Sequence, residues 1–250
     1  GLVGVASEAS NDAEEGTVFE QSPAEGEEVE EGSTVTYTVS TGPGTVSIPN
    51  VVGDGENSAL GALEDAGFDC GTVHCDNTPA TMLDPSTHYD MVRVGIGLYG
   101  LYPCDSSRSV IKLDPVMSVR ARVTRTAHPA MGEGVSYGYT YRVPRTAVQI
   151  CTLPIGYADG LSRTLSNRME VLYRGERVRQ VGNICMDQCM VAIQQTPIHQ
   201  IPEAEYGDVM TIIGRDGDAE ISADEMARLR GTINYEVVCD FGMRLDKVYL

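Results

Sequence analysis

Cys185-Met186-Asp187-Gln188 lies near the middle of the region, residues 105–250, that decides the fold of most of this chain. Short runs of β-forming residues surround it, with glycine- and charge-rich turns between them, a pattern typical of an all-β domain. These runs span residues 116–126, 146–153, 170–173, 177–181, 190–193 and 209–213. One helix is indicated by the capping box at 222–225, followed by a glycine stop at Gly231. The sequence therefore predicts a mainly β domain.

Three further strings accompany this stretch in a fixed order. They are Val135-Ser136-Tyr137-Gly138, Gly156-Tyr157-Ala158-Asp159-Gly160 and Gly231-Thr232-Ile233-Asn234-Tyr235-Glu236-Val237. Together the four strings resemble the C-terminal domain of alanine racemase, a family that uses pyridoxal phosphate (PLP) to invert the α-carbon of alanine. The resemblance and the β-runs both indicate a closed, Greek-key-like β-barrel over residues 105–250. The resemblance to alanine racemase implies that the chain takes part in interconverting L- and D-alanine for peptidoglycan.

The resemblance also assigns roles to residues of this domain. Tyr137 matches the tyrosine that a partner subunit contributes as the base on one face of the α-carbon. A tyrosine needs nearby positive charge to act as a base at neutral pH, and without the motif Tyr137 would be a packing or surface residue. Met186 would offer its backbone N–H to the substrate carboxylate, Tyr157 would narrow the entrance, and Tyr235 would bind the cofactor phosphate. Asn183 stands where the family often has arginine, so one charge contact is in doubt.

Residues 74–104 resemble the end of the racemase PLP barrel, through His74-Cys75-Asp76-Asn77-Thr78 and the string at 88–100. Barrels of this type bind phosphate at backbone N–H groups after their last strands. By resemblance Thr78 replaces a phosphate-binding serine, and Gly95 and Ile96 supply N–H donors. Arg93 matches the residue that contacts the pyridine nitrogen, to which a guanidinium can only donate. Without the family, Arg93 would be a structural ion-pair partner.

Residues 1–73 have a different pattern. Alternating β-formers at 33–40 predict a strand with one buried face, and apolar residues at helical spacing predict a helix at 57–66. This order resembles PASTA repeats, small modules associated with cell-wall fragments. The match covers two incomplete repeats, 1–43 and 46–73, and we expect the helix to lie on the preceding sheet. The alternative is a poorly packed acidic leader.

Charge is divided unevenly along the chain. Residues 1–92 contain 18 Asp and Glu but no Lys or Arg, whereas residues 93–250 contain 18 acidic and 18 basic residues. Such a break indicates two segments of different origin, and it disfavours a nucleic-acid partner because phosphates would be repelled. Seven cysteines without a C-x-x-C pair predict no metal site and favour reduced thiols buried on strands. No run reaches the ~18 apolar residues of a membrane span, and the start lacks a signal-peptide pattern.

Lysine is scarce: Lys112 and Lys247 are the two in the sequence. PLP enzymes hold their cofactor on a lysine, and the family's lysine string is not found in residues 1–92. Three hypotheses stay open. The chain is a racemase part whose activity needs a homodimer or a partner chain supplying the barrel, a non-catalytic binder of cell-wall fragments, or a composite fragment without its own function. The racemase resemblance indicates the bacterial cytoplasm, and the PASTA resemblance points weakly to the cell surface.

Overall fold

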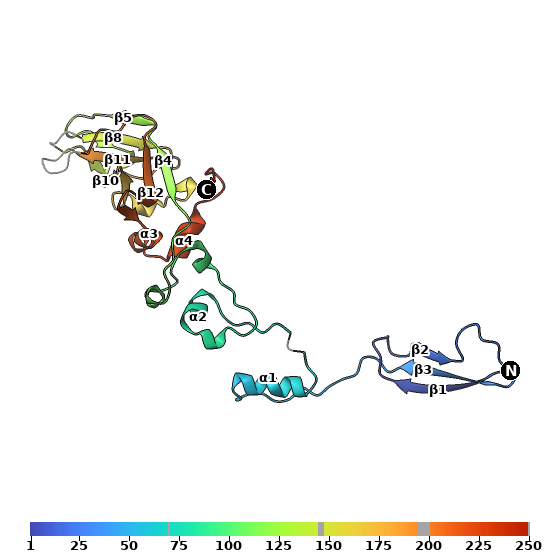
Figure 1. The fold of residues 1–250 in the computed structure, drawn as a ribbon. Helices are drawn as coiled ribbons and strands as arrows, with labels where there is room; N and C mark the ends of the chain where they lie inside the picture. Colours follow the sequence, from blue (N-terminus) through green and yellow to red (C-terminus); the bar gives the residue numbers. More distant parts are fainter. Residues whose placement is uncertain (70, 145–147, 195–200, 250) are drawn as a thin grey trace. The chain divides into compact units, whose positions relative to one another are not determined.

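The computed structural model describes residues 1–69, 71–144, 148–194 and 201–249. They form two compact units, residues 1–73 and 74–250 (Figure 1). Within these described ranges, no helix is long and apolar enough to cross a membrane.

The first unit contains a three-stranded sheet in the order β1 (Val3–Ala9), β3 (Thr34–Ser40) and β2 (Val18–Ser22). The central strand β3 pairs in parallel with β1 and antiparallel with β2. Its alternating sequence forms the expected strand, but every residue of β1 and β2 is exposed. Ser40 is the one buried residue of β3, and its hydroxyl donates to the carbonyl of Ala13 at 2.8 Å. The strand pattern is therefore realised without a buried core.

A helix, α1 (Glu56–Asp65), follows in the same unit, close to the predicted range, and Gly67 has the positive φ of a helix stop. None of its residues is buried. The sequence analysis expects this helix to lie on the preceding sheet. Residues 59–63 are half-buried, but the absence of any buried residue does not support that packing.

The second unit begins with short helical segments and continues as a mainly β domain, which confirms the predicted fold class. Its early helical segments are α2 (Thr78–Leu83), η1 (Pro85–Thr87), η2 (Ile96–Tyr99) and η3 (Asp105–Ser109). The main sheet contains β4 (Val119–Arg122), β5 (Arg125–Ala127), β8 (Val148–Leu153), β9 (Glu170–Tyr173), β10 (Glu176–Val181), β11 (Cys189–Gln194), β12 (Val209–Asp216) and β13 (Ala219–Ile221). A separate pair is β6 (Gly134–Val135) and β7 (Tyr141–Arg142).

The strand order of the main sheet matches the predicted Greek-key topology. Strands β9, β10 and β11 pair consecutively, and β11 also pairs with β8, the strand before β9; all these pairs are antiparallel. At one end β8 also pairs with β5, and at the other end β9 pairs with β12, which pairs with β4. Val123 and Thr124 join β4 directly to β5, and their N–H groups donate to Asp208 and Thr152 respectively. The pairing thus runs from β5 through β8, β11, β10, β9 and β12 to β4, the strand that directly precedes β5 in the chain.

The core of the second unit is formed by residues of these strands together with residues of the helices and connections. Its fully buried members include Leu153 on β8, Leu172 on β9 and Ile212 on β12. Among the described residues, no apolar side chain before Ile96 is buried. The core is therefore confined to the second unit.

Two helices complete the second unit. Helix α3 (Ala223–Arg230) begins and ends as the sequence predicts, because the Ser222 hydroxyl accepts the N–H of Glu225 at 3.1 Å and Gly231 has a φ of 77°. The sequence analysis did not identify the second helix, α4 (Asn234–Asp240). Its two adjacent valines are common in strands and give a weak helix signal.

The cysteines follow the prediction only in part. Cys151 on β8 and Cys189 on β11 are buried, and burial raises the pKa of each thiol to about 12. Cys75, Cys104 and Cys239 are exposed, because they lie in loops or on the outer side of α4. Cys70 lies outside the described residues.

Candidate functional site

Two loops of the second unit are held together by backbone hydrogen bonds. The segment η5 (Tyr157–Asp159) lies in the long connection from β8 to β9, and the turn at 185–188 precedes β11. The N–H of Tyr157 donates to the carbonyl of Cys185, and the N–H of Ala158 donates to that of Met186, both at 3.0 Å. A Cβ on Gly156 would lie 2.2 Å from the Cys185 carbonyl, so the approach requires glycine there. The structure therefore brings Tyr157 and Met186 together.

The loop of Tyr137 is tied to the same region. Tyr137 begins η4 (Tyr137–Tyr139), after Ser136, which has a φ of 65°. The Ser136 hydroxyl donates to the carbonyl of Asn183 at 2.6 Å, and the Asn183 side-chain amide donates to the carbonyl of Tyr137 at 2.7 Å. The sequence analysis noted Asn183 only as a departure from the family. The structure shows that it fixes the Tyr137 loop beside the turn that carries Met186.

The side chains of these loops project outward. Tyr137 is 76% exposed, Tyr157 44% and Met186 53%. Contiguous exposed apolar patches mark contact surfaces, whereas single exposed apolar side chains are common on any protein surface. Tyr137 is therefore a surface residue of this chain, with its backbone fixed and its hydroxyl accessible.

Asp159 and Asp187, which the sequence analysis does not assign to chemistry, share one arginine. The Arg244 Nε atom lies 3.2 Å from Asp159 Oδ1, and Arg244 Nη2 donates to Asp187. These two carboxylates raise the pKa of the guanidinium, with its hydrogen bond to Asp187 as the largest cause. Sequence reasoning missed Arg244. No local motif marks it, because its partners lie 85 and 57 residues earlier in the chain.

The residues predicted to bind the cofactor form a second group. Thr78 is 3% exposed and is the first residue of α2, and its hydroxyl oxygen accepts the N–H of Gly95 at 2.8 Å. Gly95 precedes η2, whose first residue, Ile96, is buried in the core. A Cβ on Gly97 would lie 2.9 Å from Thr78 Cγ2, so this approach is close. The structure thus brings Thr78, Gly95 and Ile96 together.

Arg93 lies beside this group. Its side chain donates to the carbonyl of Cys75 at 3.1 Å and to the carbonyl of His74 at 3.3 Å, and it contacts the His74 ring. These contacts orient the guanidinium with backbone carbonyls. Among the described residues Arg93 forms no ion pair with a carboxylate, so the alternative prediction of a structural ion pair finds no support there.

Tyr235 reaches the core from α4. It is half-buried and packs against the same core cluster as Ile96, and burial, followed by the nearby Cys104, raises its pKa. The preceding Asn234 is buried, and its amide donates to the carbonyl of Tyr102 at 2.9 Å. This contact fixes the start of α4 to the segment that follows η2.

Neither lysine lies among these groups. The side chain of Lys112 is 87% exposed, and its Nζ atom is 4.0 Å from Asp114. Lys247 is also exposed, in the C-terminal segment. Among the residues that the structure describes, neither lysine forms a hydrogen bond or ion pair with Thr78 or Arg93.

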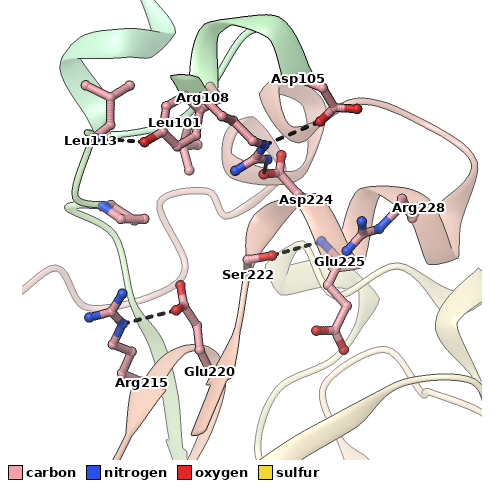
Figure 2. Close-up of a pocket in the computed structure, with 13 residues that line it drawn as sticks. Leu101, Asp105, Arg108, Leu113, Arg215, Glu220, Ser222, Asp224, Glu225 and Arg228 are labelled. Atoms are coloured by element: carbon pink, nitrogen blue, oxygen red, sulfur yellow. Dashed lines mark hydrogen bonds and ion pairs between the residues drawn. The ribbon is translucent and has the colours of Figure 1, made fainter. Parts of the chain in front are cut away.

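A pocket lies elsewhere, between the segment at 100–115 and α3 (Figure 2). It has a volume of about 490 Å³. Its charges are largely paired: Arg108 binds Asp105 and Asp224, and Arg215 binds Glu220 at 3.1 Å (Figure 2). The eight predicted site residues are not part of its described lining. These internal pairs leave no clear preference for a ligand of either charge.

Comparison with known families shows the origin of each region. The family model "Alanine racemase, C-terminal domain" matches residues 116–249, and "Alanine racemase, N-terminal domain" matches residues 56–103. The PASTA domain model matches residues 1–41. The N-terminal racemase match therefore includes α1, which the sequence analysis placed in an incomplete PASTA repeat.

Individual proteins agree with these matches. The chain is 42% identical to an alanine racemase of Nostoc sp. over 190 residues, which are 76% of this chain and 48% of the relative. It is 43% identical to alanine racemase 2 of Bacillus subtilis over 77% of this chain and 48% of the relative. The chain spans about half the length of the curated relatives it matches.

Solved structures give the same result. An alanine racemase of Bacillus anthracis with bound L-Ala-P superposes with a TM-score of 0.67 at 39% identity, covering 74% of this chain and 46% of that one. A Clostridium difficile alanine racemase in complex with cycloserine gives 0.70 at 36%, covering 78% and 49%. More than half of the chain matches the C-terminal racemase model, so this protein belongs to the alanine racemase family and carries a PASTA domain at its N-terminal end.

Proposed function

We propose that this chain supplies the substrate-facing half of an alanine racemase site and requires a second chain for the lysine that anchors PLP. One observation carries the proposal: hydrogen bonds hold the loops of Tyr137, Tyr157 and Met186 together with their side chains exposed, whereas in the described part of the chain neither lysine forms a hydrogen bond or ion pair with these loops. The exposed loops are therefore available to complete a site on another chain. In this proposal residues 105–250 are the β domain, residues 74–104 are the end of a PLP barrel, and residues 1–73 are the PASTA-like segment.

Each side chain has a distinct role in the proposed reaction. Racemisation needs one proton-transfer group on each face of the α-carbon, because the proton leaves one side and returns to the other. The Tyr137 hydroxyl oxygen takes or delivers the proton on one face of the alanine α-carbon. The Met186 N–H binds the substrate carboxylate, and Tyr157 restricts the entrance. The second proton-transfer group comes from the partner chain.

The residues present fit one end of PLP. When bound, PLP supplies the electron sink that makes the α-carbon acidic. Thr78, the N–H groups of Gly95 and Ile96, and the Tyr235 hydroxyl would hold its phosphate, and the hydrogen bond from Gly95 N–H to Thr78 supports the grouping of those two residues. Arg93, oriented by the His74 and Cys75 carbonyls, would donate to the pyridine nitrogen. The group that would attach PLP covalently is not found here, because in the described part of the chain neither lysine forms a hydrogen bond or ion pair with these residues.

The partner is either a second copy of this chain or a different chain that supplies the barrel. A homodimer would repeat the exposed loops but would add no lysine near Thr78, so a barrel-bearing partner accounts better for activity. The substrate is alanine, and the racemase match favours the cytoplasm. The PASTA match points in the other direction, to the cell surface.

The test is D-alanine formation from L-alanine by the purified chain with PLP, alone and mixed with a separately expressed racemase barrel that carries the lysine. Circular dichroism first shows that the chain is folded. We expect no activity from the chain alone and activity in the mixture. Activity of the chain alone would contradict the proposal and point to Lys112 or Lys247. Inactivity in both samples would also contradict it.

The PASTA match to residues 1–41 favours a second function, the binding of cell-wall fragments. The sheet offers exposed side chains on β1 and β2 and carries acidic residues without a basic one. Calorimetric titration of the chain with purified peptidoglycan fragments tests this function. Saturable binding that is lost when residues 1–41 are removed would support it, and the absence of heat would exclude it for the fragments used.

A further inference from the structure

Arg244 joins the two loops that carry Tyr157 and Met186. Its Nε atom lies 3.2 Å from Asp159 Oδ1 in one loop, and its Nη2 atom donates to Asp187 in the other. A planar guanidinium can direct separate N–H groups at two acceptors, which a lysine ammonium does less well. A single side chain outside both loops therefore bridges them.

The Asp159 carboxylate depends on this bridge. Asp159 is 5% exposed, and its Oδ2 atom accepts the N–H of Gly156 at 2.8 Å. The Oδ1 atom pairs with Arg244. Removing the cation would leave a buried carboxylate without a compensating charge and would leave Asp159 and Asp187 to repel each other.

The C-terminal segment that carries Arg244 is also seated against the first loop. Gly160 has a φ of 109°, and a Cβ at this position would lie 2.4 Å from the carbonyl oxygen of Asp240, the last residue of α4. This backbone contact fixes where the segment leaves α4. The close approach of Gly160 to Asp240 thus holds the segment that carries Arg244 near the Tyr157 loop, separately from the ion pairs of Arg244 itself.

We propose that Arg244 is a positioning residue that holds the Tyr157 loop and the Met186 loop in register. The Tyr157–Cys185 and Ala158–Met186 backbone hydrogen bonds are the contacts that it preserves. Its consequence for alanine rests on the function proposed above: Arg244 sets the affinity for the substrate, through Met186 and Tyr157, and acts little on proton transfer. The positioning itself does not depend on activity.

Hydrogen exchange on the folded chain tests the positioning directly. The variants are Arg244→Gln, Arg244→Lys and, as a matched control, Arg215→Gln, which removes an exposed ion pair with Glu220. We expect the amides of Tyr157 and Ala158 to exchange roughly ten- to a hundredfold faster in Arg244→Gln, the size of a lost charge-assisted hydrogen bond. In Arg244→Lys the exchange rates of these amides should lie between those of the unmodified chain and Arg244→Gln, and in Arg215→Gln they should equal those of the unmodified chain. Equal exchange in all variants would overturn the proposal.

Steady-state kinetics in the mixture with the racemase barrel separate positioning from a general loss of structure. We expect the KM for L-alanine to rise in Arg244→Gln while kcat stays within about threefold, and Arg244→Lys to restore part of the KM. A lower kcat with unchanged KM would indicate fewer folded sites and would overturn the proposal. If the unmodified mixture is inactive, the proposed function fails, and the exchange data still decide the role of Arg244.

Discussion

The two sheets of this chain are both built from β-forming residues but differ in what they bury. Strand β3 of the first unit alternates threonine with valine and tyrosine, whereas β9 of the second ends in a continuous run, Val171-Leu172-Tyr173. Every residue of β1 and β2 is exposed, whereas Val171, Leu172 and Tyr173 on β9 are almost fully buried. β-forming residues therefore specify strands, while a core requires enough strands and connections to enclose the apolar side chains. The second unit meets this condition by returning its pairing to β4 and β5.

The largest expected contrast between the units is a matched leucine truncation. Leu153 is fully buried on β8, whereas Leu2 is 57% exposed. Leu153→Ala should lower the free energy of unfolding of the second unit by about 2–5 kcal/mol, because it leaves a cavity. Leu2→Ala should change that of the first unit by less than about 0.5 kcal/mol. Urea unfolding with residue-resolved hydrogen exchange measures both, and equal effects would refute the difference in burial.

Glycine-to-alanine substitutions sharpen the comparison, because the change in the free energy of unfolding should have opposite signs in the two units. Gly156→Ala places a methyl group 2.2 Å from the Cys185 carbonyl and should cost about 1–3 kcal/mol. Gly61 lies within α1 with nothing within 4 Å of its virtual Cβ. Gly61→Ala should therefore stabilise that helix by about 0.5–1 kcal/mol. Circular dichroism and urea unfolding measure these changes, and destabilisation by Gly61→Ala would show that α1 packs more closely than its exposure indicates.

Alkaline pH tests the interior of the second unit. Burial, with a hydrogen bond to Asp208, raises the pKa of Tyr173 to about 12. Between pH 10 and 12 the unfolded tyrosine loses its proton while the folded one keeps it, so the Tyr173 contribution is complete below pH 10 and is lost as pH rises through the folded pKa. Unfolding free energies measured from pH 9 to 11.5 should therefore fall less steeply in Tyr173→Phe. Parallel slopes would contradict the assignment, since Cys151 and Cys189 are present in both proteins.

The smallest expected effect is on the Tyr137 loop. Asn183→Ala removes the 2.7 Å hydrogen bond to the carbonyl of Tyr137 and should cost about 1 kcal/mol. Because the loop is exposed, the loss should appear as faster amide exchange near η4 and not in β8. Exchange that rises equally in both places would mean that Asn183 supports the whole barrel.

Sequence reasoning reached the fold class because short β-runs and the Ser222–Gly231 helix signals are local. It also identified Tyr157 and Met186, whose loops the structure places together. Arg244 and the bridging role of Asn183 could not be found this way, since their partners are distant in sequence and no spacing marks them. The expected burial of α1 failed for a physical reason: its few apolar residues, such as Leu60 and Leu63, fix a helix face but do not specify what covers it.

We propose above that Tyr137 transfers a proton to or from alanine when a second chain supplies the PLP barrel. Its most direct test is D-alanine formation in the mixture with that barrel, comparing Tyr137→Phe with Tyr139→Phe, an exposed neighbour in the same η4 segment. We predict that Tyr137→Phe lowers kcat by about 10²–10⁴-fold, the usual contribution of a general acid or base, while Tyr139→Phe keeps most activity. Full activity in Tyr137→Phe, or equal losses in both variants, would contradict the account.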